Sequence, residues 1–139
     1  MPIQDIARTE VMTAGRDQSA GNLATVMAEE KVGSVVIEED DDPVGIVTDR
    51  DLAIQVLEPR EDPTEVTAEE IMTETPVTVD ADQGIFEATA TMADEGVRRM
   101  PVVDDGNLSG IFTLDDLVVL LTDEMTNLAG VIETESPPY

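Results

Sequence analysis

The 139-residue chain contains no cysteine and no histidine. The residues that most often serve as nucleophile or general base in enzymes are therefore absent, as are the soft ligands of zinc and copper sites. Disulfides are excluded as well. Carboxylate pairs such as Asp115 and Asp116 remain as catalytic candidates, but Asp116 stands where a capping or binding role is expected. We therefore expect a protein that is not an enzyme and has no metal site.

Aromatic residues and long apolar runs are also scarce. Aromatics make up 2% of the chain and apolar residues 41%, so the core has to be built from Val, Ile, Leu, Met and Ala. No apolar run approaches the roughly 18 residues of a membrane-spanning helix. The N-terminus has neither the basic nor the apolar region of a signal peptide. We expect a cytoplasmic protein without a membrane partner.

Positive charge is the third scarcity. There are 7 basic residues against 32 acidic ones, which gives a formal net charge of -25. Nucleic acid is excluded as an expected partner, because its phosphates require Lys and Arg. Disorder from high net charge is an alternative, but the dense Val, Ile and Leu pattern argues against it except in the tail, residues 136–139. We interpret the charge as adaptation to high salt, where screening removes the self-repulsion.

What the sequence does contain is an internal repeat. The stretch Gly45–Leu52 returns 65 residues later as Gly110–Leu117. Both copies read glycine, two apolar residues, threonine, two variable residues, aspartate and leucine. The same offset, without a gap, aligns other identical residues, among them Asp17/Asp82, Gln18/Gln83, Met27/Met92, Ala28/Ala93 and Val32/Val97. An ungapped match of this length predicts one fold, duplicated.

Each half predicts the element order β-α-β-β-α. A helical lead-in precedes a short first strand (10–14 and 75–79), and in the second half Thr67–Glu70 has the pattern of a capping box. An amphipathic helix follows, with an apolar stripe made by Ala20, Leu23, Met27 and Ala28 or by Ile85, Ala88, Met92 and Ala93. Two strands joined by a polar turn come next (35–38 and 44–48, or 100–103 and 108–113). The last helix covers 49–57 or 114–122.

These elements predict two units, residues 1–57 and 67–122, joined by a linker at 58–66. Since each unit buries little surface alone, we expect the two to share a core. Residues 123–139 are predicted to form a further helix, broken near Gly130, and a loose tail. The acidic run Glu38–Asp42 lacks the alternating ligand spacing of a calcium loop and is interpreted as a solvated hairpin tip.

The repeated stretch predicts a corner between a strand and a helix. Thr48 and Asp51, like Thr113 and Asp116, stand at the spacing of a helix start. One interpretation is a capping box alone. The other is a ligand site, because a carboxylate can hold a ribose diol and a hydroxyl can contact phosphate. Recurrence does not separate the two interpretations, since both helices need caps.

At this point the chain resembles a known family. The duplicated unit with Gly-Ile-Val-Thr-x-x-Asp and Gly-Ile-Phe-Thr-x-x-Asp corners resembles tandem CBS-domain proteins (Bateman modules), and the run Val97–Asp104 is similar to the family's second motif. The resemblance covers about residues 3–122 and, with the acidic composition, is to a stand-alone protein of haloarchaeal type. It implies an α/β (α+β) fold in which two CBS units pack about a pseudo-twofold axis and leave two clefts.

The resemblance also implies a regulatory role and a ligand class. The clefts would bind AMP, ADP or ATP, or else S-adenosylmethionine or NAD, with no cofactor required. Asp51 and Thr48 would hold ribose and phosphate in one cleft, and Asp116 and Thr113 in the other. The base would lie near the first strands and Pro101. The candidate ligand-binding residues are therefore Val11, Thr13, Thr48, Arg50, Asp51, Val77, Val79, Arg98, Arg99, Pro101, Thr113 and Asp116.

The two halves differ in their cations. Arg98 and Arg99, the expected phosphate contacts of the Asp51 cleft, align with Gly33 and Ser34, and Arg50 aligns with Asp115. We therefore expect a nucleotide in the Asp51 cleft. The other cleft, with no nearby cation except Arg16, is predicted to be weak, empty or occupied by an uncharged adenosyl group. Ion pairing with the abundant carboxylates is the alternative role for the two arginines.

The expected protein partners are a second copy of the chain and a regulated protein. A homodimer and an unidentified regulated protein are expected from the resemblance. The alternative function is an interaction module that dimerises through its helices and leaves its clefts empty.

Overall fold

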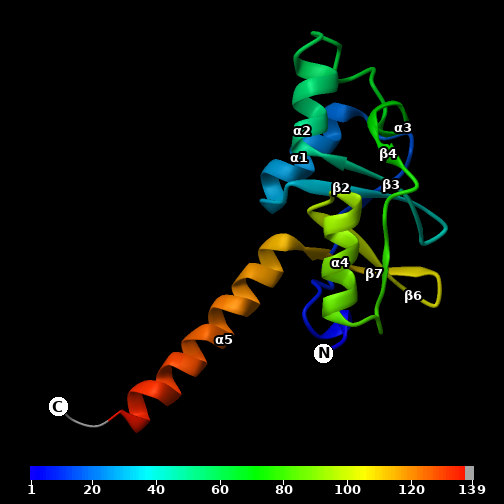
Figure 1. Cartoon of the computed structure of the whole chain (residues 1–139). Coiled ribbons are helices and arrows are strands. Elements are labelled where there is room, and N and C mark those ends of the chain that lie inside the picture. The colour runs from blue at the N-terminus through cyan, green and yellow to red at the C-terminus, as the bar shows by residue number, and fades with distance from the viewer. Residues whose placement is uncertain (137–139) are drawn as a thin grey trace.

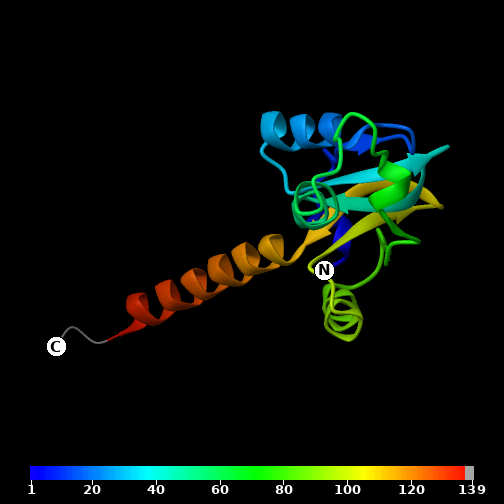
Figure 2. The ribbon, with the colours of Figure 1, turned by 90° about the horizontal axis from the view of Figure 1, so that it is seen from above.

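Two β-sheets stack face to face in the computed structural model, which describes residues 1–136 (Figure 1). The first sheet has the order β1 (Thr13–Ala14), β2 (Ser34–Glu39), β3 (Asp42–Thr48), β4 (Thr73–Glu74). The second has the order β5 (Val79–Asp80), β6 (Arg99–Asp104), β7 (Asn107–Thr113). Helices cover the outer faces of both sheets (Figure 2). The predicted α+β fold is confirmed.

The amphipathic helix of each half begins where the apolar stripe predicts and buries most of that stripe. Helix α1 (Ala20–Glu30) buries Ala20, Leu23 and Met27, and α4 (Ile85–Glu95) buries Ile85, Ala88 and Met92. Ala28 and Ala93 are exposed, so their inclusion in the stripe was wrong. The helices end at Lys31 and Gly96, both in the left-handed region that closes helices.

The first strands are shorter than predicted. Only two residues in each half pair with the neighbouring strand, Thr13–Ala14 and Val79–Asp80. The structure adds β4, which no pattern predicted, because two residues carry no visible periodicity. The predicted capping box at Thr67 is also wrong: Thr67 precedes helix α3 (Ala68–Ile71), but its side chain makes no capping bond.

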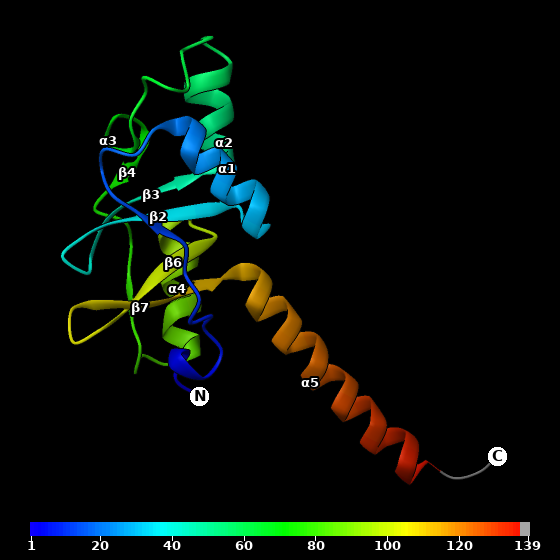
Figure 3. The same ribbon diagram turned by 180° about the vertical axis from the view of Figure 1, so that it is seen from behind.

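The lead-in segments are exchanged between the halves. Ile3, in the 3-10 turn η1 (Ile3–Asp5), is buried in the core of the second half, whereas Ala68 and Ile71 of α3 are buried in the core of the first. Backbone bonds of the same kind fix both, from Ile3 N–H to the Gln83 carbonyl and from Ala68 N–H to the Gln18 carbonyl, each at 2.8 Å. The two crossing segments run along opposite sides of the molecule (Figures 1 and 3). Each half is therefore completed by the other.

The corner glycines allow the exchanged segments to cross the sheets. Gly45, in β3, faces the side chain of Met72, and a Cβ there would collide with it. Gly110, in β7, faces the backbone carbonyl of Arg8, and a Cβ there would also collide. Arg8 pairs with Ile111 of β7 as Thr73 pairs with Ile46 of β3. Glycine in this motif is thus explained by close approach of a second backbone or side chain.

The strand pairs close with two-residue turns. Asp40 and Asp41 have positive φ, as do Asp105 and Gly106, which suits the tight hairpin connections that match strand twist. The acidic run is therefore a hairpin tip, as predicted. Over residues 1–136, no cluster of three or more potential metal-ligating side chains is found.

The final helices of the two halves differ most. In the first half, α2 (Asp49–Leu52) and a π-helical turn, η2 (Ala53–Leu57), end early, and the linker returns over α1. In the second half, α5 (Leu114–Glu135) continues for 22 residues and extends away from the body (Figure 1). It passes through Gly130, so the predicted break is wrong; one glycine costs only about 1 kcal/mol in a helix.

The absence of a membrane-spanning helix and the loose tail were both expected from the sequence. No helix within residues 1–136 is long and apolar enough to cross a membrane. Residues 137–139 of the predicted tail lie outside the described part of the chain.

Candidate functional site

Both strand-to-helix corners form complete capping boxes. In the first, Asp51 N–H donates to Thr48 Oγ1 at 3.2 Å, and Thr48 N–H donates to Asp51 Oδ2 at 2.8 Å. In the second, Asp116 N–H donates to Thr113 Oγ1 at 3.2 Å, and Thr113 N–H donates to Asp116 Oδ2 at 3.3 Å. The capping interpretation is confirmed at both. It does not exclude a ligand, because each carboxylate has a second oxygen.

A first cleft of about 400 Å³ opens beside the first corner. It lies within the size range of small-molecule sites. Its walls come from both halves: β3 with the start of α2, the crossing segment around β4, and the start of β6. The lining residues are Ile46, Thr48, Asp49, Arg50, Thr73, Thr75, Pro76, Val77, Val97, Arg98 and Arg99. Five predicted site residues thus meet here: Thr48, Arg50, Val77, Arg98 and Arg99. Asp51 adjoins them through its bonds to Thr48.

A second cleft of about 290 Å³ opens beside the second corner. Gly33 and Ser34 border this cleft, as the repeat predicts. Its lining residues are Arg8, Glu10, Val11, Met12, Lys31, Val32, Gly33, Ser34, Arg98, Arg99, Ile111, Thr113 and Asp115. Four of the predicted site residues are among them: Val11, Arg98, Arg99 and Thr113.

The predicted lack of cations in the second cleft is wrong. Four of the chain's seven basic residues line it: Arg8, Lys31, Arg98 and Arg99. Arg16, the one cation expected there, instead donates to Glu39 and Glu69 at 3.3 and 3.4 Å. The prediction failed because Arg98 and Arg99 border both clefts and because Arg8 arrives through the exchanged segment.

The two adjacent arginines differ in their surroundings. Arg99 is half-buried, and its guanidinium lies against Gly33, where a Cβ would stand 3.2 Å from Nη1. The Arg98 side chain is 71% exposed, and its Nη2 lies 3.9 Å from Oδ1 of Asp115, which is 80% exposed. Such a pair contributes little. Arg99 is therefore the better-fixed cation of the two.

Five predicted site residues line neither cleft. Asp51 and Asp116 adjoin the clefts through their bonds to Thr48 and Thr113. The other three are Thr13, Val79 and Pro101. Val79 is 2% exposed and packs in the core of the second half, and Pro101 is fully buried. Thr13 is exposed on β1 but borders neither cleft. Strand alternation turns these side chains away, since successive residues point to opposite faces. Thr75 and Pro76 line the first cleft instead and Met12 the second.

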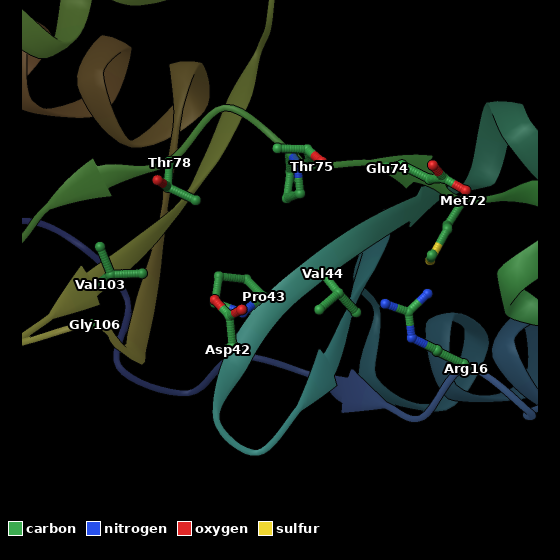
Figure 4. A pocket seen from close by; sticks show the side chains of 11 residues that line it. Arg16, Asp42, Pro43, Val44, Met72, Glu74, Thr75, Thr78, Val103 and Gly106 are labelled. Carbon is green, nitrogen blue, oxygen red and sulfur yellow. The ribbon is translucent and has the colours of Figure 1, made fainter.

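A third cavity of about 430 Å³ lies beside the hairpin tips, where no site was predicted (Figure 4). It shares Thr75 and Pro76 with the first cleft. Arg16 borders it together with Asp42 and Glu74. Because Arg16 is already bound by two carboxylates, the residues described around this cavity offer no unpaired cation to an anion.

Comparison with known proteins identifies the family. The CBS domain family matches this chain twice, over residues 3–58 and 68–123. The chain belongs to the CBS-domain proteins. It carries the domain in tandem, and the two matches correspond to the two halves described above.

Relatives and solved structures agree with this assignment. An uncharacterized protein of Methanopyrus kandleri is 42% identical over 118 residues, which are 84% of this chain and 60% of that protein. The CBS domain-containing protein YhcV of Bacillus subtilis is 32% identical over 126 residues, 90% of this chain and 86% of that one. The crystal structure of the CBS domain pair of protein MJ0100, in complex with 5′-methylthioadenosine and S-adenosyl-L-methionine, superposes with a TM-score of 0.80 and 26% identity, covering 89% of this chain and 98% of the other.

Proposed function

We propose that this CBS-domain pair is a regulatory module that binds an adenosyl ligand in the first cleft. The observation that carries the proposal is the state of the first corner. Within residues 1–136, Asp51 Oδ1 accepts no hydrogen bond, and the Thr48 hydroxyl accepts one without donating any. A carboxylate oxygen and a hydroxyl proton are thus available beside three arginines.

Each wall of the first cleft suits one part of an adenine nucleotide. Asp51 supplies the acceptor for a ribose diol. Arg50 and Arg99 supply planar cations for phosphate. Pro76 and Val77 supply an apolar wall for the base. AMP, ADP and ATP fit this combination best, with S-adenosylmethionine and NAD as the other candidates. The complex of the MJ0100 domain pair supports the ligand class.

A ligand in this cleft would act on the packing of the two halves. Thr48 and Arg50 come from the first half, whereas Val77, Arg98 and Arg99 come from the second. A ligand that contacts both favours the arrangement in which they are close, and only such a preference can shift an equilibrium. The module would pass this change to a partner protein by altering its surface, without catalysis.

Calorimetric titration with AMP, ATP, S-adenosylmethionine and NAD in molar salt tests the proposal. At least one of them is expected to bind, and the Asp51→Ala variant is expected to weaken its binding at the first cleft. Asp116→Ala is the matched control, because it removes the equivalent cap and leaves the first cleft intact. The absence of binding by all four ligands would contradict the proposal.

A second candidate function is dimerisation, and helix α5 favours it. Leu121, Met125, Leu128 and Ile132 form a stripe at helical spacing and are 54–71% exposed. The stripe continues into an apolar groove between α4 and α5, where Phe86 is 92% exposed. Such contiguous apolar surface marks an interaction site.

The first half shows how the equivalent groove is covered. There the linker lies over α1, and the Pro63 carbonyl accepts from Gly21 N–H at 2.9 Å. In the second half Phe86 stands at the position of Gly21 in the repeat, and its side chain is 92% exposed. We propose that α5 of a second copy covers the groove, since groove and stripe on one chain can pair reciprocally about a twofold axis.

The dimer is tested by sedimentation in molar salt. Leu128→Asp is expected to give monomers while the secondary structure is unchanged, because the Leu128 side chain is 64% exposed. A Thr126→Asp control on the same helix keeps the stripe and should remain dimeric. A wild-type monomer would contradict the dimer, and dimers that bind no adenosyl compound would favour the interaction module.

We further propose that the module works in a salt-rich cytoplasm, as a protein of haloarchaeal type. A net charge of -25 on 15.0 kDa gives strong self-repulsion that short-range screening removes. The thermal midpoint is therefore expected to rise from dilute buffer to molar salt. An unchanged midpoint would contradict this part of the proposal.

A further inference from the structure

The two corners differ in which carboxylate oxygens are free. Asp116 Oδ2 accepts from Thr113 N–H at 3.3 Å and from the Thr113 hydroxyl at 2.9 Å. Its Oδ1 accepts from Arg8 Nε at 2.9 Å. Both oxygens of Asp116 and the proton of Thr113 are thus engaged. At the first corner only Asp51 Oδ2 is engaged within residues 1–136.

One residue of the exchanged segments accounts for the difference. Arg8 exchanges backbone bonds with Ile111, at 3.0 and 2.9 Å, and its side chain reaches Asp116. At the matching place in the first half, Thr73 pairs with Ile46 and lines the first cleft. A threonine side chain carries no cation to Asp51. The same backbone position therefore presents a guanidinium to one corner and a hydroxyl to the other.

We propose that Arg8 occupies the diol acceptor of the second cleft and closes it to adenosyl ligands without phosphate. The inference rests on the proposed function, because it assumes that the free Asp51 corner is what receives the diol. A neutral ligand such as 5′-methylthioadenosine offers nothing to replace Asp116 as the partner of Arg8. It fills the first cleft only.

A phosphate-bearing ligand can open the second cleft. The Arg8 side chain is 62% exposed and free to turn, whereas the Asp116 side chain is only 12% exposed. Phosphate can replace Asp116 as the bidentate partner of the guanidinium. Lys31 and Arg99 border the same cleft and favour an anion there. The second cleft is thus selective for phosphate, with Arg8 as the residue that determines the selectivity.

The internal repeat provides matched variants. Arg8→Thr gives the second cleft the residue of the first, and Thr73→Arg gives the first cleft the residue of the second. Neither change removes the backbone pairing, because both residue types already occupy this position in one half. The doubly exchanged variant is expected to transfer the open corner from the first cleft to the second.

Calorimetric stoichiometry with 5′-methylthioadenosine and ADP in molar salt tests the inference. The wild-type protein is expected to bind one 5′-methylthioadenosine and Arg8→Thr two. In Thr73→Arg the affinity of the first cleft for 5′-methylthioadenosine is expected to fall at least tenfold. ADP should bind the wild type at two sites of unequal affinity.

Two equal sites for 5′-methylthioadenosine in the wild type would overturn the role of Arg8. One unchanged site for 5′-methylthioadenosine in both Arg8→Thr and Thr73→Arg would also overturn it, while leaving the proposed function intact. If neither 5′-methylthioadenosine nor ADP bound to the wild type or to any variant, both the role of Arg8 and the proposed function would be overturned. Thr73→Arg keeps the test decisive if Arg8→Thr fails to fold.

Discussion

The two strand-to-helix corners share a fold and differ in availability. Both have the same capping box, and both stand beside a cleft bordered by Arg98 and Arg99. Among the described residues 1–136, nothing donates to one oxygen of Asp51, whereas Asp116 is held by Arg8. Duplication has therefore preserved the residues that build the corner, and a residue outside the corner, delivered by the exchanged segment, decides whether the corner is open.

The largest expected effect concerns the glycines that begin the corners. In Gly110→Ala the new Cβ meets the Arg8 backbone, which cannot move alone, and about 3 kcal/mol of unfolding free energy should be lost. In Gly45→Ala it meets the Met72 side chain, which can turn aside, so about 1 kcal/mol is expected. Denaturant unfolding in molar salt measures both. Equal losses would show that the two crossings are equally rigid.

The next effect separates capping from ligand binding. Asp51→Ala and Asp116→Ala each remove a cap and should each lose about 1 kcal/mol of stability. Only Asp51→Ala is expected to weaken AMP binding at the first cleft, by about 2 kcal/mol or roughly 30-fold, because a hydrogen bond to a charged group is lost. If Asp51→Ala loses stability and keeps its affinity, the corner serves only as a cap.

The smallest effect compares the adjacent arginines. Arg99→Ala should lower ATP affinity about tenfold, or about 1.4 kcal/mol, since its guanidinium is held against Gly33. Arg98→Ala should change it by no more than about twofold, because the side chain is largely exposed. Binding of uncharged 5′-methylthioadenosine should be the same in both variants. A larger loss for Arg98→Ala would reverse their assigned roles.

The local features were predictable because they depend on neighbouring residues. The periodic stripe of α1 and α4, the hairpins and the corner all follow from spacing within a few residues. Alignment of the halves at a constant offset of 65 residues also predicted that Gly33 and Ser34 border the second cleft. Short pairings such as β4 carry no such signal and were missed.

The exchange of segments was not predictable from local pattern. It places Ile3 in the second core and Ala68 in the first, so the units of residues 1–57 and 67–122 are continuous in sequence but not in packing. The same exchange brings Arg8 to Asp116 across 108 residues. Aligning Arg8 with Thr73, once the crossing is known, is what reveals the difference between the clefts.

A crystal structure of the protein grown with 5′-methylthioadenosine tests the central claim most directly. The account predicts the ligand in the first cleft, with its ribose hydroxyls on Asp51, and an intact pair between Arg8 and Asp116 in the second. A ligand bound at Asp116, with the Asp51 corner empty, would contradict it.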